Sequence, residues 1–337
     1  MYLVRPVDFA DLPALERLAQ QAGIGITNFP ANRERLNDKI ASSRRSFQTD
    51  VVQPGDESYL FVLVDTSNDQ IIGCCGIDAM VGVDTPFYSY RIDEVVHASP
   101  QLQIHNRVPA LFLCHDYSGT SRLIALVVDK AHQNTVAMSL LSRARLLFIA
   151  RYPERFTARL FAELRGESDK HGYSSFWDAL GKHFFSMDFK KADYLSGVSN
   201  KNFIAELMPR YPIYVPTLPE AAQDAIGVIH EDSDQSADIL LNEGFEFRGY
   251  VDIFDAGPSI EARTESLRTI AQQKMDKALS LTDKAKGPMH LISAGHLEHF
   301  RVTAAHAEPQ VAGLAIEKAT QERLGISSGH RIQWVAL

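Results

Sequence analysis

The segment from Ala125 to Phe148, ALVVDKAHQNTVAMSLLSRARLLF, has the pattern of a buried strand, a short polar turn and a long helix. A helix N-terminus presents free backbone N–H groups and the positive end of the helix dipole, and both favour an anion such as phosphate. Sites of this kind usually have glycines in the turn, because the backbone can then approach the ligand closely. The turn Gln133–Met138 contains none. The segment is therefore either an anion site or a plain connection between a strand and a helix.

Three arginines lie near this turn. Arg122 precedes the strand, and Arg143 and Arg145 lie further along the helix. Each positive charge could screen the charge of a bound phosphate. Surface arginines are common, so an ordinary surface position is the alternative for each of them.

The composition is that of an ordinary globular protein, with 45% apolar and 23% charged residues among 337. The net charge is −8, and no Lys/Arg-rich run occurs. These features argue against a general polyanion-binding role, so we expect no nucleic-acid partner. A small anionic ligand stays compatible with them, because it needs only a local site.

The cysteines and the N-terminus predict a cytoplasmic protein. Cys74, Cys75 and Cys114 have no metal-type spacing, and we expect reduced, buried small residues. The first 15 residues contain no apolar signal core, and no stretch of about 18 apolar residues occurs. We therefore expect neither export nor a membrane span.

Hydrophobic periodicity and turn residues predict alternating strands and helices with some hairpins. In the first part of the chain we expect a strand at Tyr2–Val4, a helix with the apolar stripe Leu12, Leu15, Leu18 and Ala19 that stops at Gly23, a helix at Arg33–Phe47, a hairpin over Leu60–Ile77 and short strands between Tyr88 and Leu113. Later we expect a strand in RLFAELRGESD, a Ser-capped helix in SSFWDALGKHFF, a short helix in NFIAELM, a helix near Glu220–Ile226, and a helix stopped at Gly244 followed by a strand.

This order predicts an α+β fold, with a mixed sheet layered with helices rather than a doubly wound parallel sheet. The run Asp255–Pro258 is a boundary signal. We therefore predict a larger region at 1–257 and a small, mostly-β C-terminal subdomain at 258–337.

Several long blocks resemble the arginine N-succinyltransferase family of the GNAT N-acyltransferase superfamily. They include RPVDFADLPALERLA, VHASPQLQIHN, HGYSSFWDALGKHFFSMDF, AELMPRYPIYVPTLPEAAQDAIGVIH and GFEFRGYVDIFDAGPSIEART, and the resemblance covers almost the whole chain. LCHDYSGTSRL and the glycine-free turn are most similar to the alpha subunit of the two-subunit arginine/ornithine succinyltransferase. The resemblance implies a GNAT-like fold, in which the acyl-CoA pyrophosphate lies on the turn between a central strand and the next helix.

The resemblance also implies an activity. The family transfers succinyl from succinyl-CoA to the α-amino group of L-arginine, the first step of a route of arginine catabolism, and ornithine is a plausible second acceptor. Succinyl-CoA is a co-substrate, no metal or bound cofactor is implied, and the beta subunit is the expected partner. The VIH motif implies that His230 is the proton donor, and the strand Leu123–Val127 implies that Leu126 contacts succinyl-CoA.

The turn departs from the family pattern. Single-subunit members have an Arg-x-x-Gly-x-Gly-like turn, where this chain has Gln133, Val136 and Met138. Side chains therefore occupy space where backbone would meet phosphate. The departure supports a second hypothesis, that the chain is a weakly catalytic or non-catalytic alpha subunit that supports a catalytic beta subunit.

The implied chemistry suggests further residues. A histidine can donate a proton to the leaving thiolate, and a strand backbone at Leu126 can pair with the pantetheine arm like an added strand. A guanidinium group needs carboxylates. Candidate carboxylates are Asp78, Glu94, Asp116 and Glu163; candidate pocket residues are His97, His105 and Asn106; and we expect core packing for Phe176, Trp177, Phe184 and Phe185.

Overall fold

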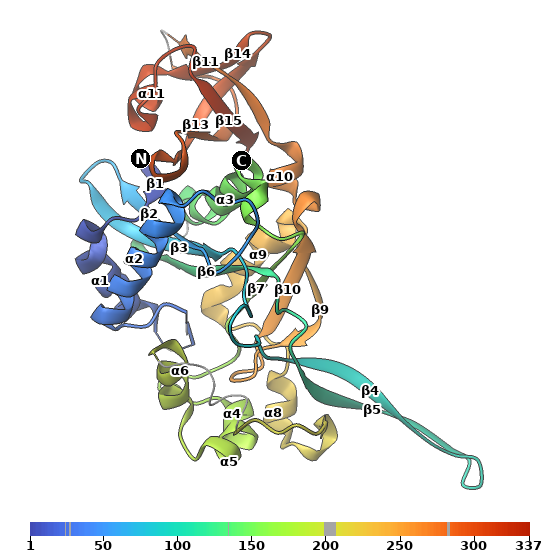
Figure 1. Ribbon diagram of the computed structural model, residues 1–337. Coiled ribbons are helices and arrows are strands. Elements are labelled where there is room, and N and C mark those ends of the chain that lie inside the picture. The colour runs from blue at the N-terminus through green and yellow to red at the C-terminus, as the bar shows by residue number, and fades with distance from the viewer. Residues whose placement is uncertain (24, 27, 134, 199–206, 282–283) are drawn as a thin grey trace.

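The computed structural model of the chain describes residues 1–23, 25–26, 28–133, 135–198, 207–281 and 284–337. Fifteen strands in these residues form one continuous sheet, in the order β12-β15-β11-β14-β13-β1-β2-β3-β6-β7-β10-β9-β4-β5-β8. Most neighbouring strands are antiparallel, and β6 and β7 form a parallel pair in the larger part of the sheet. The predicted α+β fold, a mixed sheet with helices on its faces, is therefore confirmed (Figure 1).

The strands of the larger part are β1 (Tyr2–Pro6), β2 (Ser58–Asp65), β3 (Gln70–Asp78), β4 (Ser89–Ser99), β5 (Ile104–Cys114), β6 (Ser121–Val128), β7 (Arg159–Glu163), β8 (Ile213–Tyr214), β9 (Glu246–Val251) and β10 (Pro258–Arg263). The helices are α1 (Leu12–Ala22), α2 (Arg33–Gln48), α3 (Val136–Arg151), α4 (Ser175–Ala179), α5 (Gly181–Phe185), α6 (Phe189–Val198), α8 (Glu220–Ala225), α9 (Asp234–Glu243), α10 (Arg268–Gln272) and α11 (Lys318–Leu324).

Alternating side chains of β2 place the sheet between two helical layers. Leu60 and Val62 pack with α1 and α2, whereas Phe61 and Leu63 pack with α3. This is the two-residue period of a strand that is buried on both faces. The predicted stripe of α1 is buried, and Gly23 ends that helix with φ 81°. Helix α3 is buried almost all round, because it contacts β3 and β6 on one side and β12 and β13 on the other.

The C-terminal strands are β11 (Lys274–Leu281), β12 (Met289–Ala294), β13 (Arg301–Gln310), β14 (Gly313–Glu317) and β15 (Arg331–Ala336). Each of them pairs with two others of the set, so that together they close into a small barrel, and β13 also pairs with β1. The predicted mostly-β character of this part is confirmed. Strand β10, which begins at Pro258, lies in the larger sheet between β7 and β9. A strand from beyond the predicted 257/258 boundary therefore belongs to the larger part, and the division into domains stays a prediction.

Two local predictions differ from the structure, and a third is not tested by it. The segment between Tyr88 and Leu113 forms two 11-residue strands, β4 and β5, whose hairpin projects from the body (Figure 1). The Ser174-capped helix breaks at Leu180, which has a φ of −128° and a ψ of −73°, and two short helices result. The predicted short helix in NFIAELM lies mainly outside the described residues.

The predicted helices at Arg33–Phe47 and near Glu220–Ile226, the hairpin β2–β3, and the helix that stops at Gly244 are confirmed. The predicted core pairs are buried with one exception, since Phe184 is 42% exposed. All three cysteines are free; Cys74 and Cys75 are buried as predicted, and Cys114 is only partly so.

Candidate active site

Leu126 lies where β6 loses its partner on one side. Strand β6 pairs with β7 only over Ser121–Leu123. Beyond Leu123, no described strand pairs with this side of β6, although β3 continues to pair with the other side. Free backbone N–H and C=O groups at a strand edge are a template for an extended ligand.

A β-bulge changes the direction of β6 at this point. The register with β3 shifts between Cys74, opposite Val127, and Gly76, opposite Ile124. Ala125 in the bulge has a φ of 55°, and the Asn28 Oδ1 atom accepts its N–H at 2.9 Å. A non-glycine residue in this conformation costs about 1–2 kcal/mol, and bulges with such strain occur often beside functional sites. The segment before α2 thus holds the strand edge that contains Leu126.

His230 is held by backbone contacts with the loop that follows β7. Ile229 forms an isolated antiparallel bridge with Gly166 and packs against the main core. The His230 N–H donates to the Arg165 carbonyl at 2.9 Å. Its Nδ1 atom accepts the Asp232 N–H at 3.1 Å, and its side chain is 11% exposed. Because Nδ1 is an acceptor here, the neutral imidazole carries its proton on Nε2.

The structure brings Leu126, His230 and the turn together in one pocket of about 640 Å³. The end of α1 at Gln21–Gly23 and the loop Ser168–His171 form other parts of its wall. The cations at this pocket include the exposed side chains of Lys130 and Lys170. A strand edge, a histidine that can donate a proton and the N-terminal end of α3 therefore share one cavity.

Side chains of the turn form hydrogen bonds with backbone groups in the turn and in the preceding strand. The Gln133 Nε2 group donates to the Val128 carbonyl at 3.1 Å. Thr135 is the N-cap of α3, and its Oγ1 atom accepts the Ala137 N–H at 3.1 Å. The buried Met138 side chain lines the pocket where the single-subunit pattern has a glycine. The helix terminus keeps its dipole, but at least one of its N–H groups already has a partner.

The three arginines predicted near the turn have other roles. Arg143 and Arg145 are each 2% exposed; Arg143 pairs with Glu243 at 2.8 Å, and Arg145 donates to the Ser142 carbonyl and hydroxyl. Arg122 pairs with Asp78 at 2.8 Å and with Glu163 at 3.1 Å. Their guanidinium groups are therefore buried in the fold, and both alternatives considered for them, phosphate contact and surface residue, were wrong.

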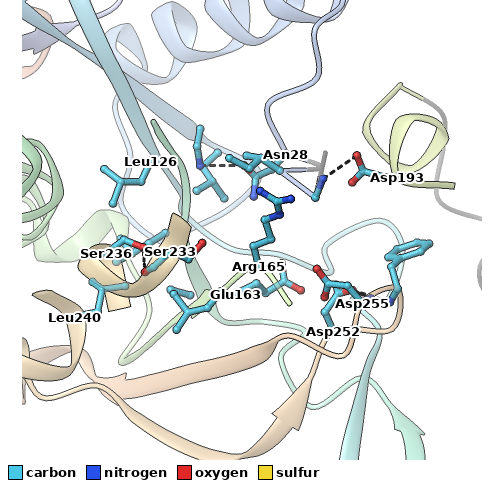
Figure 2. Close-up of a pocket in the computed structure, with 18 of the residues that line it drawn as sticks. Asn28, Leu126, Glu163, Arg165, Asp193, Ser233, Ser236, Leu240, Asp252 and Asp255 are labelled. Carbon is cyan, nitrogen blue, oxygen red and sulfur yellow. Dashed lines mark hydrogen bonds between the residues drawn. The ribbon is translucent and has the colours of Figure 1, made fainter. Parts of the chain in front are cut away.

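A smaller cavity of about 100 Å³ adjoins the first and shares with it Ile26, Leu126, Arg165, Ser233 and Ser236. Figure 2 shows Arg165 in its middle, with carboxylates around it. The acidic residues of the lining are Glu163, Asp193, Asp252 and Asp255. Strand pairing explains the cluster. Glu163 ends β7, and Asp252 and Asp255 lie on the turn between β9 and β10. Because β10 pairs with β7, this turn lies beside Glu163.

Burial weakens the charged forms in this cavity. It raises the pKa of Asp193 to about 6, and it raises that of Asp255 to about 6 although the Gly257 and Gly166 N–H groups donate to its carboxylate at 2.8 Å. Burial, with the nearby Asp255 and Glu163 carboxylates, raises the pKa of Asp252 well above its usual value. Burial lowers the pKa of Arg165, and the neighbouring aspartates oppose this shift. A positively charged ligand would reduce the repulsion among these carboxylates.

Two of the four predicted guanidinium-binding carboxylates lie near this site. Asp78 and Glu163 line an acidic pocket on the other side of Asp252, but both already pair with Arg122. Glu94 pairs with Arg107 on the projecting hairpin, and Asp116 pairs with Arg91 at 3.4 Å.

The predicted pocket residues His97, His105 and Asn106 lie on the projecting hairpin, where His97 and Asn106 are opposite each other. The structure does not bring them to the pocket of Leu126 and His230.

The residues that the sequence reasoning missed are Arg165, Asn28, Asp193, Asp252 and Asp255. Arg165 follows a buried strand directly and precedes a glycine, which is the available signal. The aspartates come from segments more than 50 residues apart, so no spacing in the sequence reveals them.

The described residues include no group of three or more His, Cys, Asp or Glu side chains placed to hold a metal ion. A search of the same residues for a helix with the length and apolarity of a membrane span found none.

Comparisons with known proteins match the whole chain. The family described as arginine N-succinyltransferase beta subunit matches residues 2–269, and the family described as its C-terminal domain matches 277–336. Arginine N-succinyltransferase subunit alpha of Pseudomonas aeruginosa is 42% identical over 340 residues, with 100% of each chain covered. Subunit beta of the same organism is 43% identical over 336 residues, which cover 99% of this chain and 98% of that one.

A solved structure, arginine/ornithine succinyltransferase subunit AI from Pseudomonas aeruginosa, superimposes with a TM-score of 0.92 at 40% identity, covering 100% of this chain and 98% of that chain. The identities to the alpha and beta subunits differ by one percentage point. Overall similarity therefore does not assign the chain to one subunit type.

Proposed function

The chain belongs to the arginine N-succinyltransferase family, and from this premise we propose that it transfers the succinyl group of succinyl-CoA to the α-amino group of L-arginine. It is an acyltransferase, and its relatives with catalytic names include both subunit types, so a non-catalytic role is not favoured. Ornithine is the second acceptor that the reaction class allows. The observation that carries the proposal is the shared pocket of the free β6 edge at Leu126 and the imidazole of His230.

In this mechanism the pantetheine arm of succinyl-CoA lies along β6 and pairs with the backbone at Leu126. The Leu126 side chain packs against the core, so its contribution comes from main-chain groups. An N–H group directed at the thioester oxygen would stabilise the negative charge that develops when the amine attacks. The bulge at Ala125, held by Asn28, sets the direction of that edge.

His230 donates a proton to the departing sulfur. The amine nitrogen attacks the thioester carbon, the tetrahedral intermediate collapses, and the C–S bond breaks. The protonated imidazole, which has a proton on each ring nitrogen, gives its Nε2 proton to the thiolate and is left neutral with its proton on Nδ1, while the proton lost by the attacking nitrogen passes to solvent. The Asp232 carboxylate lies 3.8 Å from Nδ1, and proton exchange with solvent restores the Nε2 tautomer, whose Nδ1 accepts the Asp232 N–H.

The reaction needs no resident cofactor or metal, because aminolysis of a thioester involves no electron transfer and the thiolate leaves after a single proton transfer. Free cysteines support a reducing compartment, and we place the enzyme in the cytoplasm. We also propose that it works with a beta-type subunit, because relatives named alpha and beta subunits exist in one organism.

The test is release of the CoA thiol from succinyl-CoA and L-arginine by this chain alone and then with a beta-type subunit. Release that requires both substrates supports the proposal. A product that has the mass of N-succinylarginine and co-elutes with an authentic α-N-succinylarginine standard identifies the acceptor nitrogen. No release in either mixture contradicts it. Release only from the mixture, and none from the beta-type subunit alone, supports an enzyme that is active as a hetero-oligomer.

A further inference from the structure

Arg165 is a buried cation with unused hydrogen-bond donors. Its side chain is 10% exposed. One of its Nη groups donates to the Ser168 hydroxyl at 3.1 Å, and this is the only hydrogen bond of the side chain to a described residue. The nearest paired carboxylate, Asp232, lies 3.7 Å away and is 65% exposed. The buried Nε atom has no partner in the described part of the chain.

Such a group is costly in a folded protein. A guanidinium has five N–H donors, and an unpartnered buried donor costs about 1–3 kcal/mol. Charged groups cost more, unless an anion with hydrogen-bonding oxygens lies against them. The unused donors of Arg165 therefore indicate a ligand that accepts hydrogen bonds.

The position of Arg165 connects it with the reaction centre. It lines both the pocket that contains Leu126 and His230 and the adjoining acidic cavity. Its carbonyl accepts the His230 N–H, so a backbone hydrogen bond holds the two residues side by side. Gly25, with a φ of +95°, leaves room for the side chain, since a Cβ atom there would lie 2.9 Å from the Arg165 Nε.

We propose that the Arg165 guanidinium binds a carboxylate of a substrate beside the reacting atoms. This inference rests on the proposed function, in which both substrates supply such a group. The α-carboxylate of L-arginine is bonded to the carbon that carries the attacking nitrogen. The free carboxylate of the succinyl group is three C–C bonds from the thioester carbon. Either group can reach a cation that lies next to His230.

The surrounding charges make Arg165 decisive for an anionic group. Asp193, Asp252 and Asp255 line the adjoining cavity (Figure 2). Without the guanidinium the carboxylates of Asp193 and Asp255 would repel any carboxylate that entered, whereas an uncharged group would meet no such repulsion. Selectivity for a carboxylate-bearing substrate should therefore depend on this one side chain.

The test replaces Arg165 with Gln and measures kcat/KM for two acyl donors and two acceptors. The donors are succinyl-CoA and butyryl-CoA, which lacks the free carboxylate, and the acceptors are L-arginine and L-argininamide, which lacks the α-carboxylate. If Arg165 binds the succinyl carboxylate, the preference for succinyl-CoA over butyryl-CoA falls about 100-fold in Arg165→Gln and the acceptor preference does not change. If it binds the α-carboxylate, the preference for L-arginine over L-argininamide falls instead.

Arg263→Gln is the matched control, because Arg263 is 76% exposed and pairs with the equally exposed Glu265. It should leave both preferences unchanged. Arg165→Lys keeps the charge and should keep more of the affected preference than Gln does. If Arg165→Gln lowers all four kcat/KM values equally, the side chain has only a structural role and the inference is wrong.

Failure of the proposed function can be distinguished from failure of this inference. If the proposed function is wrong, the wild-type enzyme is inactive with all four pairs of acyl donor and acceptor. In that case calorimetric binding of L-arginine and L-argininamide, and of succinyl-CoA and butyryl-CoA, tests Arg165. Loss in Arg165→Gln of a wild-type preference for a carboxylate-bearing ligand supports the inference. A preference that persists, or a wild type with none, overturns it.

Discussion

Replacing His230 by Ala or by Asn separates its chemistry from its structural contact. Among the described residues the imidazole makes one hydrogen bond, from the Asp232 N–H to Nδ1, as the N-cap of a short 3-10 helix at Glu231–Ser233. Asparagine at an N-cap supplies a side-chain oxygen for the same N–H but has no proton to give to a thiolate. Alanine removes both the acceptor and the acid.

The magnitudes of the two effects differ. Loss of a positioned general acid lowers turnover by about 10²–10⁴-fold. Loss of an N-cap acceptor costs about 0.5–2 kcal/mol, and the exposed setting of this cap, where the Asp232 side chain is 65% exposed, favours the lower end of that range. We therefore expect kcat to fall at least about 100-fold, and about 1000-fold at the middle of that range, in both variants. Only His230→Ala should lose measurable stability.

The assay follows CoA thiol release under saturating substrates, together with urea unfolding of each variant. Added imidazole should restore part of the turnover of His230→Ala, whose cavity can admit it, and restore none to His230→Asn. Unchanged turnover in His230→Asn would remove this residue from the mechanism. Equal losses of turnover and of folded protein would show that the imidazole only supports the fold.

Three further predictions follow from the site and its supports. Asn28→Ala leaves the Ala125 N–H without its acceptor. The free energy of unfolding in urea should therefore fall by about 1–3 kcal/mol, and the KM for succinyl-CoA from initial rates should rise. Asn28→Asp is the control, because it keeps an acceptor. Glu243→Gln removes the charge that pairs with Arg143 at 2.8 Å, where both side chains are buried. The free energy of unfolding, measured in urea, should fall by about 3–5 kcal/mol. A fall of less than about 1 kcal/mol would contradict this prediction. Burial raises the pKa of Asp193 to about 6 from a usual value near 3.8, so the folded state binds this proton more tightly than the unfolded chain does. The stabilisation from this proton is therefore complete below about pH 4 and is lost as the pH rises through 6. Across that range the free energy of unfolding of the wild type should fall by about 2–3 kcal/mol relative to that of Asp193→Asn. Parallel plots of unfolding free energy against pH for the two proteins would refute the shift.

The local signals in the sequence predicted most elements of the fold. The stripe of α1 and the glycines at its end and at the end of α9 follow helical period and capping chemistry, and both appear where they were expected. The lengths of β4 and β5 were not predicted, because the exposed outer part of a hairpin has no buried face to give a period. The Trp177 ring packs where a side chain on Gly181 would be, which is a tertiary contact that helical period does not specify.

The candidate site was predictable only in part. His230 and Leu126 came from the resemblance to a family, and the structure brings them to one pocket. Neither the acidic cavity nor Arg165 was predicted, because their residues come from β7, α6 and the turn between β9 and β10. Side chains so distant in sequence meet only through strand pairing, which a residue pattern does not specify.

The arginines illustrate why a count of charges in the sequence gave the wrong candidates. Arg122, Arg143 and Arg145 lie nearest in sequence to the predicted anion site, yet each spends its donors on carboxylates, carbonyls or hydroxyls of the fold. The Arg165 side chain, which is 10% exposed, donates to a single described hydroxyl and leaves its Nε without a partner in the described part of the chain. A buried guanidinium with unused donors beside a reaction centre is unstable unless the substrate completes its shell. Donors without partners, rather than closeness to the turn, therefore identify the arginine that can recognise an anionic group.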